Sequence, residues 1–227
     1  SGMKIRCLAD RAMPVSIRCL LALRLFWAAA AFSADEQAEE EYPYIYLLRQ
    51  RHVTLKANGE KVVRLHRRIK VLKPAAVESL GEVRMPYNSY RAKAKFVRAR
   101  TILPDGRELE VDRKAIRQGQ SAGMTDYLMY EDVAELSFSM PAVRVGAILD
   151  YEIELRHHRP TLKGQSWDSF RVEANVPVQE ARYLLKAPSK LPLRICPRRT
   201  DAKPTEQKGF RSITREWVFK DVPRFHF

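Results

Sequence analysis

The sequence predicts a mostly β protein, either an antiparallel β-sandwich or a curled open sheet with few short helices. Three observations lead to this fold class. From Tyr44 onward, apolar and polar residues alternate with a period of two, which is typical of strands with one buried face. Turn-forming residues interrupt this alternation at short intervals. Helix signals are few, and residues 74–80, with Pro74 in the first turn, form the one short helix that we expect.

The first hairpin is the strongest local prediction. A strand over 44–56 is followed by the turn Asn58-Gly59 and by a returning strand over 61–73. Asn-Gly favours this turn because both residues tolerate the positive φ that a tight hairpin requires.

The same pattern continues to residue 219 and predicts two further hairpins, four more strands and two loops. In order these are a hairpin over 94–112 with its turn at Pro104-Asp105-Gly106, a hairpin of 134–143 with 147–156 around Gly146, the strands 168–175, 179–187, 191–195 and 211–219, and the loops 114–123 and 201–209.

Charged residues form rows on the polar sides of several strands. On 61–73 an apolar row, which Arg67 interrupts, lies opposite a basic row. On 147–156 the apolar row lies opposite three carboxylates, Asp150, Glu152 and Glu154. Opposite charges that face each other on neighbouring strands stabilise a sheet by roughly 0.2–1 kcal/mol per pair. We therefore interpret the carboxylates as part of paired solvent faces and not as a catalytic cluster.

The first 33 residues are typical of a leader. Ser1-Gly2 before a Met resembles an expression-vector scar. A basic lead-in, an apolar run over 20–32 broken only by Arg24, and small residues at 28–31 then follow in the order of a secretory signal peptide. This run is shorter than the ~20 residues that span a bilayer, so no integral membrane segment is expected after cleavage. An uncleaved anchor or a buried helix is the alternative.

The chain is therefore divided into four parts. Residues 1–33 are the scar plus signal peptide, 34–42 an acidic spacer, 43–224 a single β-sandwich domain, and 225–227 the start of a linker to a further domain. A signal peptide implies export, so we expect a periplasmic or extracellular protein.

Positive charge is concentrated in the β domain. The whole chain has a formal net charge of +14. Without the leader, which holds five basic residues and one acidic residue, the charge is +10, and without the five acids of the spacer it is +15. Such an excess favours polyanionic surroundings, which for an exported protein are headgroups, glycans or wall polymers. Nucleic acid is not an expected partner, because export leads away from it.

The sequence contains no recognisable catalytic or metal-binding motif. Cys196 is the only cysteine after the leader, so neither an intrachain disulfide nor a CxxC metal site is expected. His157 and His158 are adjacent at a strand end and point to opposite faces, which disfavours a shared metal ion. We expect no catalytic residue, no metal and no cofactor.

Five residues are candidates for binding. Tyr87, Tyr90, Arg91 and Lys93 cluster in an expected loop, and Trp167 follows a Gly-containing turn. Aromatic rings beside basic groups are suited to stacking on sugars or to contact with another domain. Packing within the domain is the alternative role for each of them.

The order of these features resembles a bacterial domain of unknown function that precedes transglutaminase-like domains in exported proteins. The stretches that carry the resemblance are VVRLHRRIKVL (62–72), AKFVRARTILPDGRELEV (94–111), YEDVAELSFSMPAVRVGAILDYEIEL (130–155), the run from Trp167 to Val178, and REWVFKDVPR (215–224).

The resemblance implies a β-sandwich-like fold and a downstream domain with a papain-like Cys-His-Asp site. No residue here matches that nucleophile motif, so the resemblance provides no catalytic residue. The function expected from it is a non-catalytic N-terminal accessory module that positions or shields the downstream domain. The alternatives are a binding module for anionic glycan or cell-envelope polymer, and a small enzyme that uses Cys196.

Overall fold

The structure, a computed structural model, describes residues 42–120, 132–162 and 164–225. The described residues are mostly β, which confirms the predicted fold class. The elements are β1 (Tyr44–Leu55), β2 (Lys61–Val71), α2 (Ala75–Leu80), β3 (Glu82–Asn88), β4 (Ala92–Ile102), β5 (Glu108–Glu110), the 3-10 turn η1 (Arg113–Ala115), β6 (Ile116–Gln120), β7 (Val133–Ser139), β8 (Ile148–His157), β9 (Val178–Pro188), β10 (Thr205–Lys208) and β11 (Ser212–Val222). None of the helices within these ranges is both long and apolar enough to cross a bilayer.

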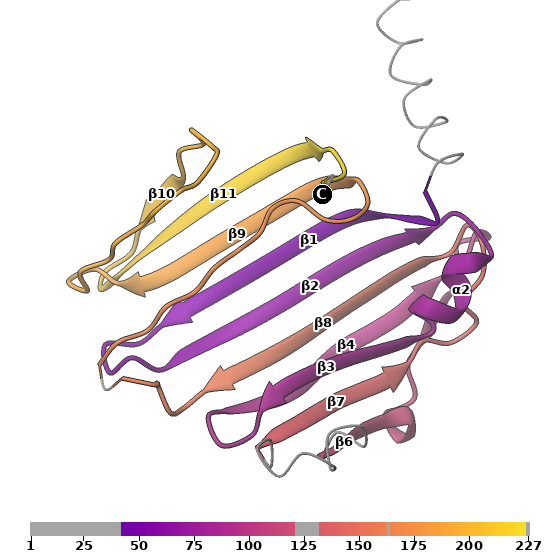
Figure 1. Ribbon diagram of the computed structural model, residues 1–227, viewed down its shortest axis with the longest axis horizontal. Coiled ribbons are helices and arrows are strands. Elements are labelled where there is room, and N and C mark those ends of the chain that lie inside the picture. The colour runs from indigo at the N-terminus through magenta and orange to yellow at the C-terminus, as the bar shows by residue number, and fades with distance from the viewer. Residues whose placement is uncertain (1–41, 121–131, 163, 226–227) are drawn as a thin grey trace, which may run out of the picture. The chain divides into compact units, whose positions relative to one another are not determined.

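Eight strands form one curled open sheet in the order β10-β11-β9-β1-β2-β8-β4-β5 (Figure 1). All neighbours in this sheet are antiparallel except β1 and β9, which are parallel. Gly59 adopts a φ of +88° in the β1–β2 turn, as the Asn-Gly pair predicts.

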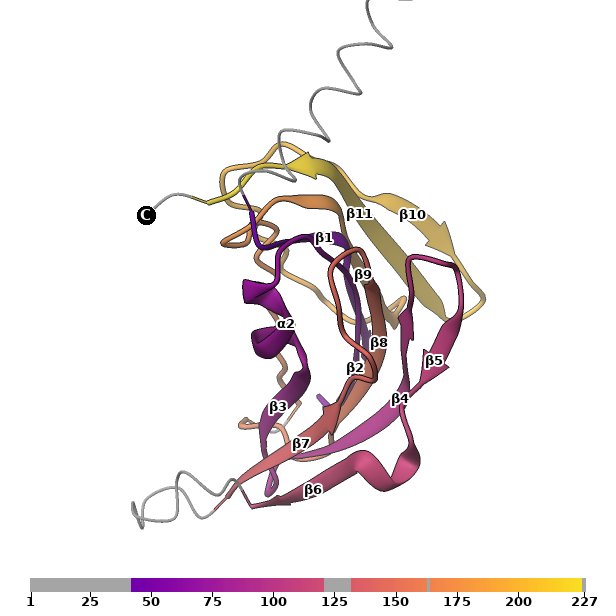
Figure 2. The ribbon, with the colours of Figure 1, turned by 90° about the vertical axis from the view of Figure 1, so that its right-hand side faces the viewer.

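A second sheet, in the order β3-β7-β6, covers part of one face of the large sheet together with α2 (Figure 2). We call this face the inner face and the opposite one the outer face. The centre of the contact is Phe138 of β7, whose ring meets Phe96 at 5.1 Å and Tyr151 at 6.0 Å, both edge to face. Leu136, Leu149 and Ile153 are fully buried around it. Burying such side chains is the main source of stability in a sheet-on-sheet contact.

An extended segment, residues 165–177, crosses the remainder of the inner face and is called the strap. Arg51 of β1 binds the Asp168 carboxylate with Nε at 2.8 Å and Nη2 at 2.6 Å. Arg49 donates from Nη1 to the backbone carbonyls of Val172 at 3.1 Å and Glu173 at 2.8 Å. A second core on the strands β1, β2, β9 and β11 contains Val53, Val63, Leu65, Leu185 and Trp217.

The predicted hairpin of 134–143 with 147–156 is wrong. β7 pairs with β3 and β6 in the small sheet, whereas β8 lies between β2 and β4 in the large one. The reason is burial. In a hairpin the two apolar rows would lie side by side, but in opposite sheets Phe138 and Leu149 contribute to one core between them.

Four other expectations about local structure also differ from the structure. The strap replaces the strand expected at 168–175, and the Arg49 side chain, not a neighbouring strand, binds its carbonyls at Val172 and Glu173. No strand forms at 191–195, whereas β6 and β10 lie where loops were expected. The end of the expected loop 114–123 lies outside the described residues.

The two ends of the described domain lie together, at the opposite end of β1 from the β1–β2 turn. The guanidinium of Arg224 lies 6.0 Å from the centre of the Tyr42 ring. The backbone N–H of Phe225 donates to the carbonyl of Ala174 at 2.9 Å. The turns that connect β1 to β2 and β3 to β4 are at the other end of the sheet, which we call the turn end (Figure 1).

Candidate functional site

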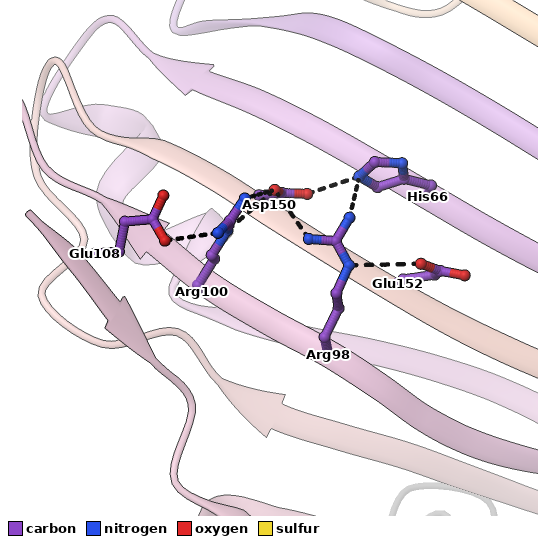
Figure 3. Close-up of polar contacts among 6 residues, drawn as sticks. All are labelled: His66, Arg98, Arg100, Glu108, Asp150 and Glu152. Carbon is purple, nitrogen blue, oxygen red and sulfur yellow. Dashed lines mark hydrogen bonds and ion pairs between the residues drawn. The ribbon is translucent and has the colours of Figure 1, made fainter. Parts of the chain in front are cut away.

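The outer face carries an ion network centred on Asp150 (Figure 3). His66 Nε2 lies 2.7 Å from one carboxylate oxygen, and Arg100 binds the other at 3.1 and 3.2 Å. Arg98 lies 3.4 Å from the same oxygen. Burial alone would raise the pKa of Asp150, but the hydrogen bond with His66 and the charge of Arg98 outweigh it and lower that pKa to about 2.

The other two carboxylates of β8 are also paired. Glu154, only 2% exposed, binds Arg64 at 2.7 Å and also Arg156. Glu152 lies 3.5 Å from Arg98. The predicted pairing of these acids with basic residues is therefore confirmed, but Asp150 and Glu154 are each only 2% exposed and do not lie on a solvent face as expected. Asp150, with its lowered pKa, stays ionised at neutral pH and is poorly suited to general acid or base catalysis.

A different group of residues lines a hollow of about 450 Å³ at the turn end. Tyr90 and Arg91 come from the β3–β4 turn, and His158, Arg159, Pro160 and Thr161 follow β8. The guanidinium of Arg159 lies 4.4 Å from the centre of the Tyr90 ring. Arg91 donates from Nη1 to the Thr161 hydroxyl at 2.8 Å. We call these six residues the basic pocket.

Backbone geometry brings the two segments of the basic pocket together. Asn88 closes the β3–β4 turn by accepting a hydrogen bond from the Arg91 N–H at 3.0 Å. Ala92 then pairs with His157, so the chain that leaves β8 runs past the turn. The Arg91 carbonyl accepts hydrogen bonds from the N–H groups of His158 at 3.0 Å and Arg159 at 3.3 Å.

The basic pocket has the chemistry of an anion-binding site. Its lining holds two arginines and a histidine but no carboxylate. Tyr90 is 54% exposed, so its ring can stack on a ligand. A guanidinium offers paired donors that match carboxylate, sulfate and phosphate groups. The combination suits a ring-bearing anionic ligand such as an acidic sugar.

The structure brings together only two of the five predicted binding residues. Tyr87 belongs to β3, packs against the core and accepts a hydrogen bond on its hydroxyl from Gln118 at 2.7 Å. Lys93 is an exposed residue of β4, not of a loop, and pairs across strands with Arg156. Trp167 is 66% exposed at the start of the strap, where its carbonyl accepts a hydrogen bond from Lys61.

Sequence reasoning missed the contribution of residues 158–161. These residues lie about seventy positions after Tyr90, and no local pattern links the two segments. The run His158-Arg159-Pro160 could have indicated this half of the pocket, because it places two basic groups beside a turn residue at a strand end.

Cys196 has no partner for nucleophilic catalysis within the described part of the chain. The thiol is free and exposed. No hydrogen bond connects it to a histidine in residues 42–120, 132–162 or 164–225. Those same ranges contain no group of three His, Cys, Asp or Glu side chains placed to hold a metal ion.

Comparison with protein families identifies the domain. A family model for a domain of unknown function, DUF3857, matches residues 57–225, which is well over half of the chain. The chain belongs to the DUF3857 family. This assignment confirms the resemblance to a domain of unknown function, on nearly the range that the sequence motifs cover.

One solved structure shows the same fold as part of a longer chain. The crystal structure of a protein from Parabacteroides distasonis, described as a putative protease, matches with 18% identity and a TM-score of 0.71 over 81% of this chain. The match covers 36% of that protein, so our chain spans about a third of its length. At this identity the match shows the shared fold alone.

A weaker match is a two-domain M1 zinc metallopeptidase mutant bound to L-tryptophan. It has 10% identity and a TM-score of 0.41 over 81% of this chain and 40% of that one. A search of curated proteins finds no similar sequence.

Proposed function

We propose that this DUF3857 domain is a non-catalytic accessory module of a longer exported protein. In this proposal it precedes a transglutaminase-like or protease-like domain with Cys-His-Asp chemistry, and positions or shields that domain in the periplasm or outside the cell. The observation that carries the proposal is the match to a protein described as a putative protease, of which the shared fold makes up about a third.

The position of the chain ends supports this role. Tyr42 and Arg224 are in contact, so a polypeptide can enter and leave the domain at one place. A domain with adjacent ends can be joined to a neighbour there while its far end stays accessible. The turn end, with the basic pocket, would then face away from the junction.

The charge chemistry of the described residues supports a non-catalytic role. A nucleophile requires a base within hydrogen-bond reach, and the exposed Cys196 has no such partner among the described residues. Asp150 is held as a carboxylate by Arg98, Arg100 and the imidazole of His66.

The test is to isolate the natural full-length protein and measure hydrolysis of a fluorescent casein substrate. We expect activity in the full-length protein, none in the chain described here, and loss of activity on substitution of the downstream cysteine. Cell fractionation of the full-length protein should place it in the periplasm or medium. Activity of residues 1–227 alone, abolished by Cys196→Ser, would favour the enzyme alternative instead.

A second function, binding of anionic glycan, is favoured by the basic pocket. The pocket presents an exposed aromatic ring beside two guanidinium groups, which is the combination that an acidic sugar requires. The test is titration with polygalacturonate against neutral dextran. We expect binding to polygalacturonate only, weaker at higher salt because the contacts are ionic.

Matched variants distinguish pocket binding from a general effect of positive charge. Arg91→Ala and Arg159→Ala should each weaken polygalacturonate binding at least tenfold, which is about 1.4 kcal/mol. Arg113→Ala removes an exposed charge outside the pocket and should have little effect. Equal losses in all three variants would rule out the pocket as the binding site.

A further inference from the structure

Three arginines on the inner face of the large sheet have unequal sets of partners. Arg51 binds the carboxylate of Asp168 through two nitrogens. Arg49 binds two backbone carbonyls of the strap. Arg67, from β2, has an Nη1 that is sealed from solvent and has no hydrogen-bond acceptor among the described residues. Buried guanidinium donors are normally paired, so Arg67 is an exception that needs a physical explanation.

Arg67 also lies beside another positive charge. It is directly opposite Arg49 in the register of β1 and β2. Both guanidinium groups lie near the ring of Tyr46, with Arg49 at 5.3 Å and Arg67 at 6.0 Å from its centre. Arg49 Nε is a second sealed donor without an acceptor. Two partly desolvated like charges in contact with one ring repel each other more strongly than they would in water.

The pKa shifts of Arg67 and Arg49 also indicate positive charge without a counter-charge at this place. Burial lowers the pKa of Arg67. Burial and then the positive charge of Arg67 lower the pKa of Arg49. Both shifts mean that the site destabilises its own positive charges, and an anion placed between them would reverse that effect.

The carboxylates near the strap do not serve this pair. Asp168 is bound by Arg51, by Lys61 at 3.2 Å, and by the hydroxyl of Tyr183 at 3.2 Å. Asp150 lies on the outer face, on the other side of the sheet. Among the described residues, therefore, the network that neutralises Arg51 does not extend to Arg67.

We propose that Arg67 and Arg49 form a binding site for a small oxyanion, a carboxylate or a tetrahedral sulfate or phosphate group, on the inner face of the sheet. Each residue keeps part of its surface exposed, although Arg67 Nη1 and Arg49 Nε are themselves sealed. Guanidinium groups provide paired N–H donors for such an ion. Tyr151, which lies opposite Arg67 on β8, contributes a phenol that stays protonated, because burial raises its pKa to about 12. This site is separate from the basic pocket and does not depend on the proposed function.

The test is thermal unfolding of the full chain in sodium sulfate or sodium acetate from 0 to ~10 mM, with NaCl holding the ionic strength constant. At these concentrations general salt effects on protein hydration are small. We expect Tm to rise saturably with at least one of the two oxyanions, by about 3 °C at ten times the half-saturating concentration.

Substitution of Arg67 gives a result that a structural arginine would not. Arg67→Met places an apolar side chain in a row that already contains Leu65 and Ile69. We expect this variant to unfold at the same or a higher temperature than the natural sequence without oxyanion, and to lose the oxyanion response. Arg67→Lys keeps the charge without the paired donors and should respond less. Arg113→Met, the exposed control, should respond like the natural sequence.

Two results would contradict the proposed oxyanion site at Arg67 and Arg49. One is a flat Tm for the natural sequence across both titrations. The other is an oxyanion response that persists unchanged in Arg67→Met, which would place the bound ion elsewhere, including in the basic pocket. An Arg91→Met variant tested in parallel identifies that case, because it should lose the response only if the basic pocket binds the ion.

Discussion

The imidazole of His66 lies 2.7 Å from the carboxylate of Asp150, on neighbouring strands in the middle of the outer face. Asp150 is 2% exposed although this face is polar, because the side chains of β2 and β4 cover it. The buried carboxylate binds His66 of β2 and two arginines of β4, so it joins β8 to both of its partner strands. This pairing makes the stability of the sheet depend on pH.

The first prediction is a loss of stability in acid that Asp150 causes. Its pKa falls from 3.8 in the unfolded chain to about 2 in the folded one. A lowered pKa stabilises the fold fully above the unfolded value, and this contribution disappears as the pH falls from about 4 to 2. The contribution at neutral pH is about 2 kcal/mol. Urea denaturation at pH 7, 4 and 2.5 measures it.

Asp150→Asn should remove this contribution at all pH values. The variant leaves Arg98 and Arg100 without their counter-charge, so we expect a loss of about 3 kcal/mol at pH 7. Its stability should fall less steeply than that of the natural sequence between pH 4 and 2.5. Asp132→Asn, at an exposed position, is the control and should follow the natural sequence. An equal acid slope in Asp150→Asn would show that other carboxylates control the transition.

A second prediction separates backbone strain from steric contact at two glycines. Gly59 and Gly106 have nearly the same φ, +88° and +84°. A Cβ at Gly59 would lie 3.0 Å from the backbone N and O of Gln165, whereas a Cβ at Gly106 meets nothing within 4 Å. Gly106→Ala should therefore cost about 1 kcal/mol from strain alone.

Gly59→Ala should cost more, roughly 2–4 kcal/mol, because the β1–β2 turn must move away from the loop at 164–165. Chemical denaturation of the two variants gives the difference directly. Equal losses would mean that the loop yields to the methyl group without cost.

Local patterns in the sequence predicted the long strands well. Alternation and turn residues located β1, β2, β8 and β11 to within a few residues, because one face of each of these strands is mainly apolar and the other mainly polar. The Asn58-Gly59 turn could also be predicted locally, because the positive φ that it requires depends on these two residues themselves.

The order of strands could not be predicted, because pairing depends on contacts between distant residues. Nothing local indicates that β1 pairs in parallel with β9, or that β7 belongs to the second sheet. The strap alternates like a strand, but the Arg49 side chain binds its carbonyls in place of a neighbouring strand, and Arg51 binds its Asp168 carboxylate. The basic pocket could not be predicted for the same reason, because its two segments, 90–91 and 158–161, meet only in the folded chain.

The third prediction tests the contact between the two sheets. Phe138 is 1% exposed and contacts rings from β4 and β8, so Phe138→Ala should cost about 3–5 kcal/mol. Phe210 is 96% exposed, and Phe210→Ala should change stability by less than about 0.5 kcal/mol. Thermal or urea unfolding of this pair measures the effect. A small loss at Phe138 would mean that the small sheet adds little to the stability of the large one.

The fourth prediction is that Asp168 holds the strap against the inner face. Burial alone would raise the pKa of Asp168. The hydrogen bond with Arg51 and the charge of Arg51 outweigh burial and lower that pKa below its usual value, so the carboxylate is ionised at neutral pH. Asp168→Asn leaves Arg51 and Lys61 without their shared carboxylate, and we expect a loss of about 3 kcal/mol.

The strap itself provides the more specific measurement for Asp168. Its anchors at Arg49 are carbonyl bonds that remain in Asp168→Asn, so the segment should loosen first around residues 165–170. Limited trypsin digestion should then cut after Arg171 faster in the variant than in the natural sequence, while cleavage after Arg113 serves as the internal reference. If the two sites accelerate equally, Asp168 stabilises the domain as a whole, and Arg49 rather than Arg51 carries the attachment of the strap.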